Sequence, residues 1–485
     1  MNSIWPFEKK PRKVQLAALE AGLGVPGFAY FMRQRMGKTG TLLADFEMCR
    51  RAGELDTLIV VCPNSLKYAW KDAVDNEWKP GAACYVYEAA HKDRAKHFLA
   101  NGLQKIFVIN FDSLAGFLEY GYCKMFDTSR AMIAFDQSTE IKNHSAARTK
   151  AALKLSPMFK YKRVLAGKPT SNGNDELWAQ LSAIDATPMS YYGFRNTYCS
   201  MITQYVRDGN GFERSFKKVI GNQNSEQLRA AMAPFVFIAG DAYLAEFEPK
   251  IYAPIRHIEL SKEHAKLYKK MEKDFIIEME NGSITANLVL TKYLRLQQIA
   301  SGFATDSLGE LKELVPIKQN PRLNEAVRIV EEEVENKCII FARFKPSMDW
   351  LQERLLAFNP AMIRGGMSGL DVEHNKKVFN ENPSCKVLIA QIEVAKMGHT
   401  LPGTDEMPCD TLIFYENVYS LITRSEAEAR PEKMGRKVPI EVIDLSTSAM
   451  DRDILTALRK KEDAAMALMG YSRKYGVLAS SSAHE

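Results

Sequence analysis

Short apolar runs recur along this chain, and stretches in which apolar residues follow a helical spacing separate them. The runs in the first half span residues 27–31, 57–62, 106–110, 131–135 and 163–166. Those in the second half span residues 337–342, 386–390, 411–415 and 440–445. Alternation of buried strands with helices is typical of a parallel α/β sheet. Because the alternation occurs twice, the sequence predicts an α/β fold with two lobes.

The strand pattern fades between the two lobes, where helical or loop patterns dominate. The sequence therefore predicts a first lobe over residues 1–175, a helical insertion over 176–318, a second lobe over 319–465 and a tail over 466–485. One predicted helix, residues 262–273, carries a basic face. That face is either an ordinary solvated surface or a track for backbone phosphates.

Composition narrows the class of protein. The 485 residues are 46% hydrophobic and 26% charged, as in globular proteins, and 65 basic against 59 acidic residues give a net charge of +6. This balance permits a nucleic-acid partner without establishing one. The eight cysteines form no C-x-x-C pair, the first residues lack a signal-peptide core, and no apolar run approaches membrane-spanning length. We therefore expect a cytoplasmic protein.

A phosphate-loop signal follows the first apolar run. Gly37, Lys38, Thr39 and Gly40 stand between a predicted strand and a predicted helix. Glycine lets backbone N–H groups approach phosphate oxygens, the lysine reaches the β- and γ-phosphates, and the threonine hydroxyl can ligate magnesium. Met32 stands where the complete motif has its first glycine, so the prediction depends on the second half of the motif and its placement.

A carboxylate closes the fourth apolar run. Asp136 follows a buried strand, and the carboxyl ends of parallel strands meet at the edge of the sheet where a phosphate loop lies. The sequence therefore predicts Asp136 as a direct or indirect magnesium ligand, together with Thr39. The alternative is an aspartate that caps a turn.

The ordered set of segments resembles the superfamily 2 helicases, and among them the Swi/Snf-type ATPases in a compact form like those of phages and bacteria. The segments are residues 11–15 (the adenine-reading glutamine segment), 58–66 with Trp70 (motif Ia), 136–143 (the DExx box with its IKN extension), 165–172 and 176–178 (motif III), 293–299 (the LRQ helix), 339–344 (motif IV), 387–391 through Gly398 and Leu401 (motif V) and 425–435 (motif VI). The resemblance implies two RecA-like lobes with a helical insertion between them and an ATP cleft between the lobes.

In the first lobe, the resemblance gives adenine recognition to Gln15 and the binding of ATP and Mg²⁺ to Lys38, Thr39 and Asp136. Gln137 departs from the family, which has a glutamate there that orients and deprotonates the attacking water. An amide cannot accept that proton, and loss of a positioned general base typically lowers a rate about a hundredfold to ten-thousandfold. Two explanations stay open: a substitution made to trap a bound state, which we favour, and a naturally impaired enzyme.

In the second lobe, the resemblance makes Arg430 the arginine finger on the γ-phosphate. Lys433 holds the place of the family's second arginine; it keeps the charge but lacks the bidentate fork. Arg436 lies close enough in sequence to be an alternative.

The resemblance also implies that DNA runs across both lobes on the side opposite the ATP. Polar and basic residues at strand ends would contact phosphates, so recognition would be largely independent of base sequence. The candidates are Asn64, Ser65, Lys142, Asn143, His144, Lys345 and Gln391. For any single one of these residues, a role in a turn or a cap is the alternative.

The resemblance implies an ATP-dependent DNA helicase or double-stranded DNA translocase that acts on branched DNA or forks. One alternative is an RNA helicase, which the IKN extension and the helical insertion argue against. A second is an ATP-gated DNA-binding clamp with impaired hydrolysis, which Gln137 would explain. A third, a P-loop kinase, leaves the second lobe without a role.

Overall fold

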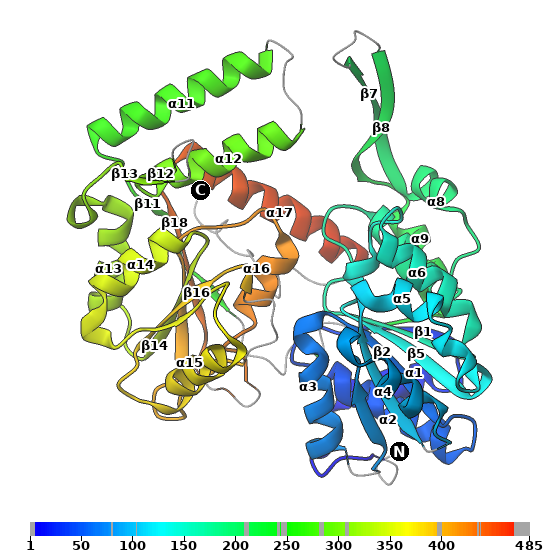
Figure 1. Cartoon of the computed structure of the whole chain (residues 1–485). Helices are drawn as coiled ribbons and strands as arrows, with labels where there is room; N and C mark the ends of the chain where they lie inside the picture. Colours follow the sequence, from blue (N-terminus) through cyan, green and yellow to red (C-terminus); the bar gives the residue numbers. More distant parts are fainter. Residues whose placement is uncertain are drawn as a thin grey trace. The chain divides into compact units, whose positions relative to one another are not determined.

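The structure, a computed structural model, describes residues 5–78, 81–102, 104–207, 213–239, 243, 250–280, 286–305, 310–394, 400–433, 436 and 438–469. The chain divides into two compact units (Figure 1). The first unit comprises Met1–Leu244 with Asp463–Ser472, and the second comprises Ala245–Glu462 with Arg473–Glu485. Each unit contains one large parallel sheet, which confirms the predicted α/β class and its two lobes.

The first sheet has seven parallel strands. Its order is β3 (Ala83–Val86), β4 (Lys105–Asn110), β2 (Thr57–Cys62), β5 (Ala131–Asp136), β6 (Tyr161–Ala166), β1 (Gly27–Phe31) and β9 (Val236–Ile238). All five apolar runs of the first half are strands of this sheet. The central strands β1, β2, β5 and β6 are fully buried, as expected for strands covered on both faces.

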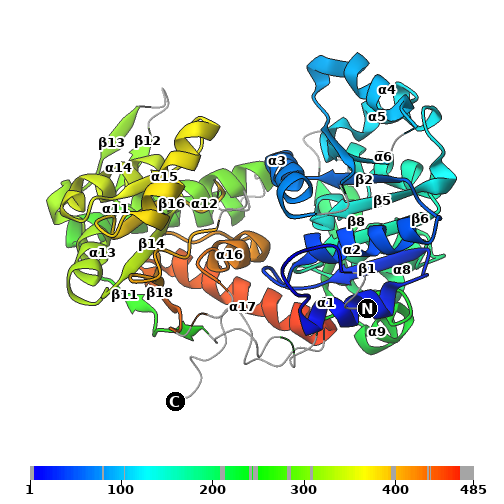
Figure 2. The ribbon, with the colours of Figure 1, turned by 90° about the horizontal axis from the view of Figure 1, so that it is seen from below.

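Helices cover both faces of the first sheet. Alternate strand residues such as Phe31 and Phe135 share a core with α4 (Lys92–Ala100), α5 (Leu114–Glu119) and α6 (Ala147–Leu155). On the opposite face lie α1 (Lys13–Gly22) and α2 (Lys38–Arg51), beside β1 in Figure 2. There the buried Asp45 of α2 accepts hydrogen bonds from Tyr30 Oη at 2.8 Å and Arg163 Nε at 2.6 Å, which fixes α2 to β1 and β6.

The segment between residues 176 and 318 contains strands as well as helices. Its helices are α7 (Trp178–Ser182), α8 (Tyr191–Tyr198), α9 (Ser225–Met232), α11 (Lys262–Glu280) and α12 (Ala286–Ala300). Its strands are the antiparallel pair β7 (Cys199–Arg207) and β8 (Glu213–Asn222), then β9, β10 (Ile251–Tyr252), β11 (Arg256–His257), β12 (Phe303–Thr305) and β13 (Leu311–Glu313). Strands therefore accompany the helical and loop patterns that were expected to dominate this segment, and these short or polar strands carry no long apolar run that would have predicted them.

The second sheet is also parallel. Its order is β10, β18 (Glu441–Ser446), β17 (Cys409–Phe414), β14 (Lys337–Ala342), β16 (Val387–Gln391) and β15 (Ala361–Ile363), with β11 also paired to β18. All four apolar runs of the second half are strands of this sheet. Its helices are α13 (Pro321–Glu332), α14 (Lys345–Arg354), α15 (Gly369–Glu381), α16 (Leu421–Glu428) and α17 (Ala449–Met469).

The end of α17 overlaps the predicted tail, residues 466–485, because the helix runs to Met469. The rest of that tail lies outside the described residues. Across the part of the chain that the structure describes, none of the helices is long and apolar enough to cross a membrane.

Candidate nucleotide-binding site

The phosphate loop joins β1 to α2. Gly37, the residue before the helix, has φ +84°, a left-handed conformation that favours glycine. A Cβ atom at this position would lie 2.5 Å from the Gln15 Nε2 atom, so a side chain would also collide with a neighbour. Helix α2 has 14 residues, and its first N–H groups face the end of the sheet where the loop lies. This loop can therefore receive a phosphate group.

Lys38 is the first residue of α2, and its ammonium group lies inside the curve of the loop. The Nζ atom donates to the carbonyl oxygens of Met32 at 3.0 Å and Arg33 at 3.3 Å. Met32, which replaces the first glycine of the motif, thus contributes its backbone rather than its side chain to this contact. The buried Met32 side chain instead contacts the Thr41 hydroxyl, with 3.9 Å between sulfur and oxygen.

Gln15 connects α1 to the phosphate loop. Its side-chain oxygen accepts a hydrogen bond from the Arg12 N–H at 3.0 Å, and its Nε2 donates to the Gly37 carbonyl oxygen at 3.0 Å. The Arg12 guanidinium also donates to the carbonyl oxygen of Arg35 in the loop. The start of α1 and the loop therefore form one hydrogen-bonded unit.

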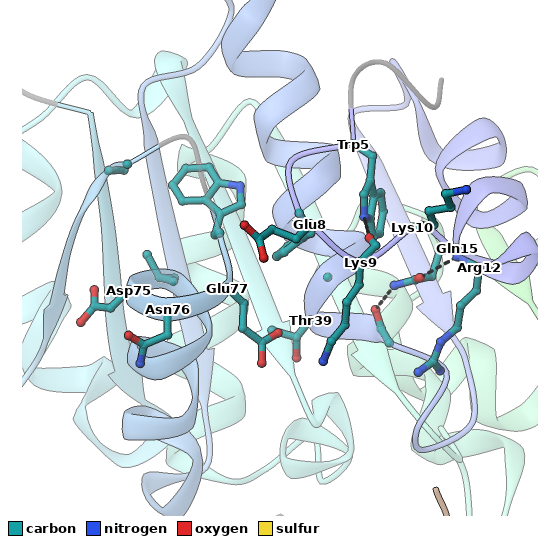
Figure 3. Close-up of a pocket in the computed structure, with 17 residues that line it drawn as sticks. Trp5, Glu8, Lys9, Lys10, Arg12, Gln15, Thr39, Asp75, Asn76 and Glu77 are labelled. Carbon is teal, nitrogen blue, oxygen red and sulfur yellow. Dashed lines mark hydrogen bonds between the residues drawn. The ribbon is translucent and has the colours of Figure 1, made fainter. Parts of the chain in front are cut away.

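A cavity of about 1040 Å³ adjoins this unit (Figure 3). It is lined by Gln15, Gly37, Thr39 and Gly40 together with aromatic residues, of which Trp5 lies beside Lys9 and Lys10 in Figure 3. The other lining residues are Phe7, Glu8, Lys9, Lys10, Arg12, Val74, Asp75, Asn76, Glu77, Trp78, Gly81 and Ala82. Flat apolar rings next to hydrogen-bonding groups suit an aromatic base better than a second anion.

Asp136 ends β5 at the same edge of the sheet, and its carboxylate is held from two sides. Oδ2 accepts from the indole N–H of Trp70 in α3 (Lys67–Asp72) at 2.9 Å, and Oδ1 accepts from the backbone N–H of Gln137 at 2.9 Å. Burial raises the pKa of Asp136, whereas the nearby charge of Lys38 and these two donors oppose that rise. Lys38 and Asp136 are therefore close enough to act on one ligand.

Gln137 adopts a left-handed backbone conformation, φ +55° and ψ +51°, between β5 and the 3-10 turn Ser138–Ile141. This conformation is uncommon for residues other than glycine and turns the chain sharply at the end of the strand. The side chain of Gln137 is half-buried. Gln137 is thus the next residue after Asp136, the carboxylate whose pKa the charge of Lys38 lowers.

The turn after Gln137 is tied to the segment that follows β6 through Gln180 of α7. The Ser138 hydroxyl donates to Gln180 Oε1 at 2.7 Å, and Gln180 Nε2 donates to the Pro169 carbonyl oxygen at 2.6 Å. Both Ser138 and Gln180 are fully buried. The sequence contained no signal for this bridge, which the fold alone brings together.

Three predicted DNA contacts lie together in the first unit. Lys142 forms a 3.1 Å ion pair with Glu176 in the 3-10 turn Asn174–Leu177. The Asn143 side-chain oxygen accepts from the Ser145 N–H at 3.0 Å, so this residue also stabilises a turn. The ring of His144 stacks on Tyr191 of α8, with 3.5 Å between ring centroids and 12° between planes.

Two further predicted DNA contacts, Asn64 and Ser65, are exposed in a 3-10 turn, Asn64–Leu66, that follows β2. In the second unit, the exposed Lys345 begins α14, and Gln391 ends β16. Gln391 Oε1 accepts from the Gly365 N–H at 2.8 Å, and its Nε2 donates to the Arg343 carbonyl oxygen at 3.2 Å. Asn64 and Ser65 thus follow the end of β2, and Gln391 is the last residue of β16.

The predicted arginine finger and its neighbours follow α16. The Arg430 backbone N–H donates to the Ala427 carbonyl oxygen at 3.1 Å, and the side chain is 4% exposed. Lys433 forms a 2.8 Å surface ion pair with Asp405. Arg436 donates to three backbone carbonyl groups, among them that of Cys409 at 2.7 Å. Arg436 is thus engaged in holding its own loop.

A parallel sheet that carries a phosphate loop after its first strand and an acid at the end of β5 defines a P-loop nucleotide-binding core. A second parallel sheet in the same chain gives the protein a second lobe. A family model described as the SNF2-related domain matches residues 31–302, more than half of the chain. The chain therefore belongs to the SNF2-related family of ATP-dependent helicases and ATPases, as the motifs predicted.

Relatives of this chain are distant in sequence. An uncharacterised ATP-dependent helicase of Mycoplasma genitalium is 22% identical over 416 residues, which cover 84% of this chain and 37% of the relative. The SWI/SNF-related matrix-associated actin-dependent regulator of chromatin subfamily A-like protein 1 of Xenopus laevis is 23% identical over 79% of this chain and 36% of its own length. The chain thus spans little more than a third of these relatives.

Among solved structures, the SWI2/SNF2 ATPase core of Sulfolobus solfataricus in complex with dsDNA is 19% identical to this chain. The comparison covers 96% of this chain and 94% of that one, with a TM-score of 0.43.

Proposed function

We propose that this chain binds Mg-ATP in its first lobe and is the core of an ATP-dependent DNA helicase or double-stranded DNA translocase. The observation that carries the proposal is the placement of Lys38 and the buried Asp136 at one edge of one sheet, beside a glycine-dependent phosphate loop. Family membership and the printed description of the Mycoplasma genitalium relative as an ATP-dependent helicase support it.

The residues present fit Mg²⁺, which prefers oxygen ligands. Asp136 has two oriented carboxylate oxygens, and Thr39, whose hydroxyl is an oxygen ligand, is the second residue of α2 at the phosphate loop. Magnesium would neutralise charge on the β- and γ-phosphates. Lys38 would bind the same phosphates once it exchanges its carbonyl partners for them, and Gln15 with the adjacent aromatic cavity would hold the adenine.

Residues of the second unit would complete the reaction. Arg430 would reach the γ-phosphate, and Lys433 would add a second positive charge that lacks the geometry of an arginine fork. ATP binding would bring the two lobes together, and hydrolysis would separate them. Asn64, Ser65, Lys142, Asn143, His144, Lys345 and Gln391 would contact the DNA backbone, so that binding would depend on salt more than on base sequence.

A second candidate function follows from Gln137 alone. A carboxamide at the position of the general base keeps the shape and one acceptor oxygen of a carboxylate, but its NH2 group donates and it takes up no proton. The chain would then grip ATP and DNA while turning over slowly, as an ATP-gated clamp. Whether the amide is natural or was introduced, the expected effect on hydrolysis is the same.

The test is the ATPase rate of this chain and of Gln137→Glu, each with and without blunt duplex DNA. We expect Gln137→Glu to raise the DNA-stimulated rate at least about a hundredfold, with little change in ATP affinity. A substituted chain that DNA does not stimulate would refute the motor. Equal rates in the two chains would refute the role of residue 137 as the base position.

A further inference from the structure

The hairpin formed by β7 and β8 projects from the first unit beside α8 and α9 (Figure 1). Its strands have nine and ten residues and pair from Cys199 with Asn222 to Arg207 with Glu213. At about 3.4 Å per residue, such a ribbon is about 30 Å long. Two-stranded ribbons are marginally stable in water, so one of this length needs a firm base.

The base of the hairpin is firmly attached to the segment that follows motif III. The Asn222 side-chain oxygen accepts from the Asn174 N–H at 2.9 Å, and Asn174 Nδ2 donates to the Tyr198 carbonyl oxygen at 3.1 Å. Arg195 of α8 donates to the Lys217 carbonyl oxygen in β8. The hairpin therefore moves with the same turn that holds Glu176 and, through it, Lys142.

Exposed aromatic and aliphatic side chains lie along the hairpin and α8. Tyr205 is 66% exposed, Ile202 is 41% exposed, and Tyr192 of α8 is 65% exposed. Pairing of Thr203 with Lys217 and of Tyr205 with Ser215 places Tyr205 and the exposed Lys217 on one face of the ribbon. Single exposed apolar residues are ordinary, but the exposed Tyr205 ring on the face of Lys217, with the exposed Tyr192 on the adjoining α8, provides both aromatic and cationic contacts.

The charge of this surface is predominantly positive. Arg195 and Lys150 lie close enough to His144 to lower its pKa, an effect secondary to burial. Lys217 adds positive charge to the face that carries Tyr205, and its neighbour Lys218, paired with Ile202, adds it to the opposite face of the ribbon. Among the acids, Asp175 is partly covered and accepts from the Tyr191 hydroxyl at 3.5 Å, and Glu213 stands opposite Arg207 in the ribbon. Phosphate groups complement such a surface, whereas an acidic protein segment would gain little from the tyrosines.

We propose that Tyr192, Tyr205 and Lys217 form a second nucleic-acid surface of the first lobe, which binds unpaired nucleotides next to a duplex. The lysine would contact a phosphate, and the exposed tyrosine rings would stack on bases, which a paired duplex does not offer. The proposal rests on the proposed function, since it assumes a DNA partner. It adds that forked or branched DNA is preferred over a blunt duplex.

The test compares the affinity for a blunt duplex with the affinity for the same duplex that carries two arms of about ten unpaired nucleotides. Both affinities are measured by fluorescence anisotropy in the presence of Mg-ATP. We expect the unsubstituted chain to bind the fork about tenfold more tightly. The double substitution Tyr192→Ala, Tyr205→Ala should abolish that preference and leave duplex affinity unchanged. Tyr192→Phe, Tyr205→Phe should retain it, because phenylalanine also stacks.

A lysine pair provides an independent measurement. Of that pair, Lys217 shares its face of the ribbon with Tyr205, so Lys217→Ala should weaken fork binding and flatten its dependence on salt by about 0.7 in the log–log slope for the lost phosphate contact. Leu370→Ala is a matched control, because Leu370 is 85% exposed in the second unit, and it should change neither substrate.

Three outcomes would overturn the proposal: no fork preference in the unsubstituted chain, a preference that survives the alanine pair, or an equal loss on fork and duplex. Each leaves intact the proposed function, which stands or falls with duplex-stimulated hydrolysis by Gln137→Glu.

Discussion

Trp70 donates a hydrogen bond to Asp136, the carboxylate that we propose as a magnesium ligand, so Trp70→Phe is a direct test of that site. The substitution keeps a ring in a buried position, where Trp70 is 2% exposed, and removes the N–H that donates to Asp136 Oδ2 at 2.9 Å. A hydrogen bond to a charged group contributes about 1.5–3 kcal/mol. Its loss would raise the ratio of protonated to ionised Asp136 about tenfold to a hundredfold.

The direction of the pH dependence follows from the pKa of Asp136. Burial already raises this pKa, and the Trp70 donor lowers it, so Trp70→Phe raises it further. Only the ionised carboxylate can hold Mg²⁺. The affinity for Mg-ATP should therefore fall more steeply in the substituted chain than in the unsubstituted chain as the pH is lowered from alkaline towards acidic values.

The measurement is the dissociation constant of a fluorescent ATP analogue with magnesium across this pH range. Because Gln137 makes turnover slow in our proposal, binding can be measured without interference from hydrolysis. Trp178→Phe is the matched control: it also removes an indole N–H, which donates at 2.8 Å to the neutral Met189 carbonyl oxygen. A loss of affinity in Trp70→Phe that is the same at every pH would refute the reasoning.

Three other substitutions test the fold around the site. Gly37→Ala should reduce ATP affinity severely and lower the melting temperature, because a Cβ atom would lie 2.5 Å from Gln15 Nε2 at φ +84°; isothermal titration and thermal unfolding check this. Asp45→Asn leaves the buried Arg163 guanidinium without its charged partner and should lower the free energy of unfolding by about 3–5 kcal/mol in urea, whereas an effect below about 1 kcal/mol would contradict it. Burial lowers the pKa of His144, so the unfolded chain binds more protons below about pH 6.5 and stability falls as the pH drops; His144→Phe should reduce that fall in thermal unfolding, and an unchanged pH profile would contradict it.

Continuous apolar runs proved to be the reliable part of the sequence. Each predicted run is a strand, since central strands of a parallel sheet are buried on both faces and must be apolar throughout. Strands of two to four residues such as β10, β11 and β15 are too short to show a period. The hairpin of β7 and β8 was missed for another reason: it is mostly solvated, so its composition resembles that of a loop.

The residues of the candidate site also fall into two groups, those that local sequence signals placed and those that only the folded chain brings together. Local signals placed Asp136 at the end of a strand and Gly37 and Lys38 between a strand and a helix, because chain order and strand direction decide where such residues lie. The partners of Asp136 and Ser138 are 66 and 42 residues away in sequence, and such pairs depend on packing that no local pattern encodes. Trp70 stood in a recognised motif, yet its hydrogen bond became visible only once α3 was positioned against β5.

The bridge through Gln180 joins the turn after Gln137 to the segment after β6 in the first lobe, and it can therefore couple ligand binding at one to ligand binding at the other. A ligand at Asp136 that changes the Ser138–Gln180 contact would change the affinity for a second ligand at the segment after β6, and that second ligand would then change nucleotide affinity by the same factor. Both ends of the bridge are short hydrogen bonds, 2.7 and 2.6 Å, in a fully buried environment that offers no competing water. The nucleotide site and the segment after β6 would therefore be coupled energetically, without a large displacement of either.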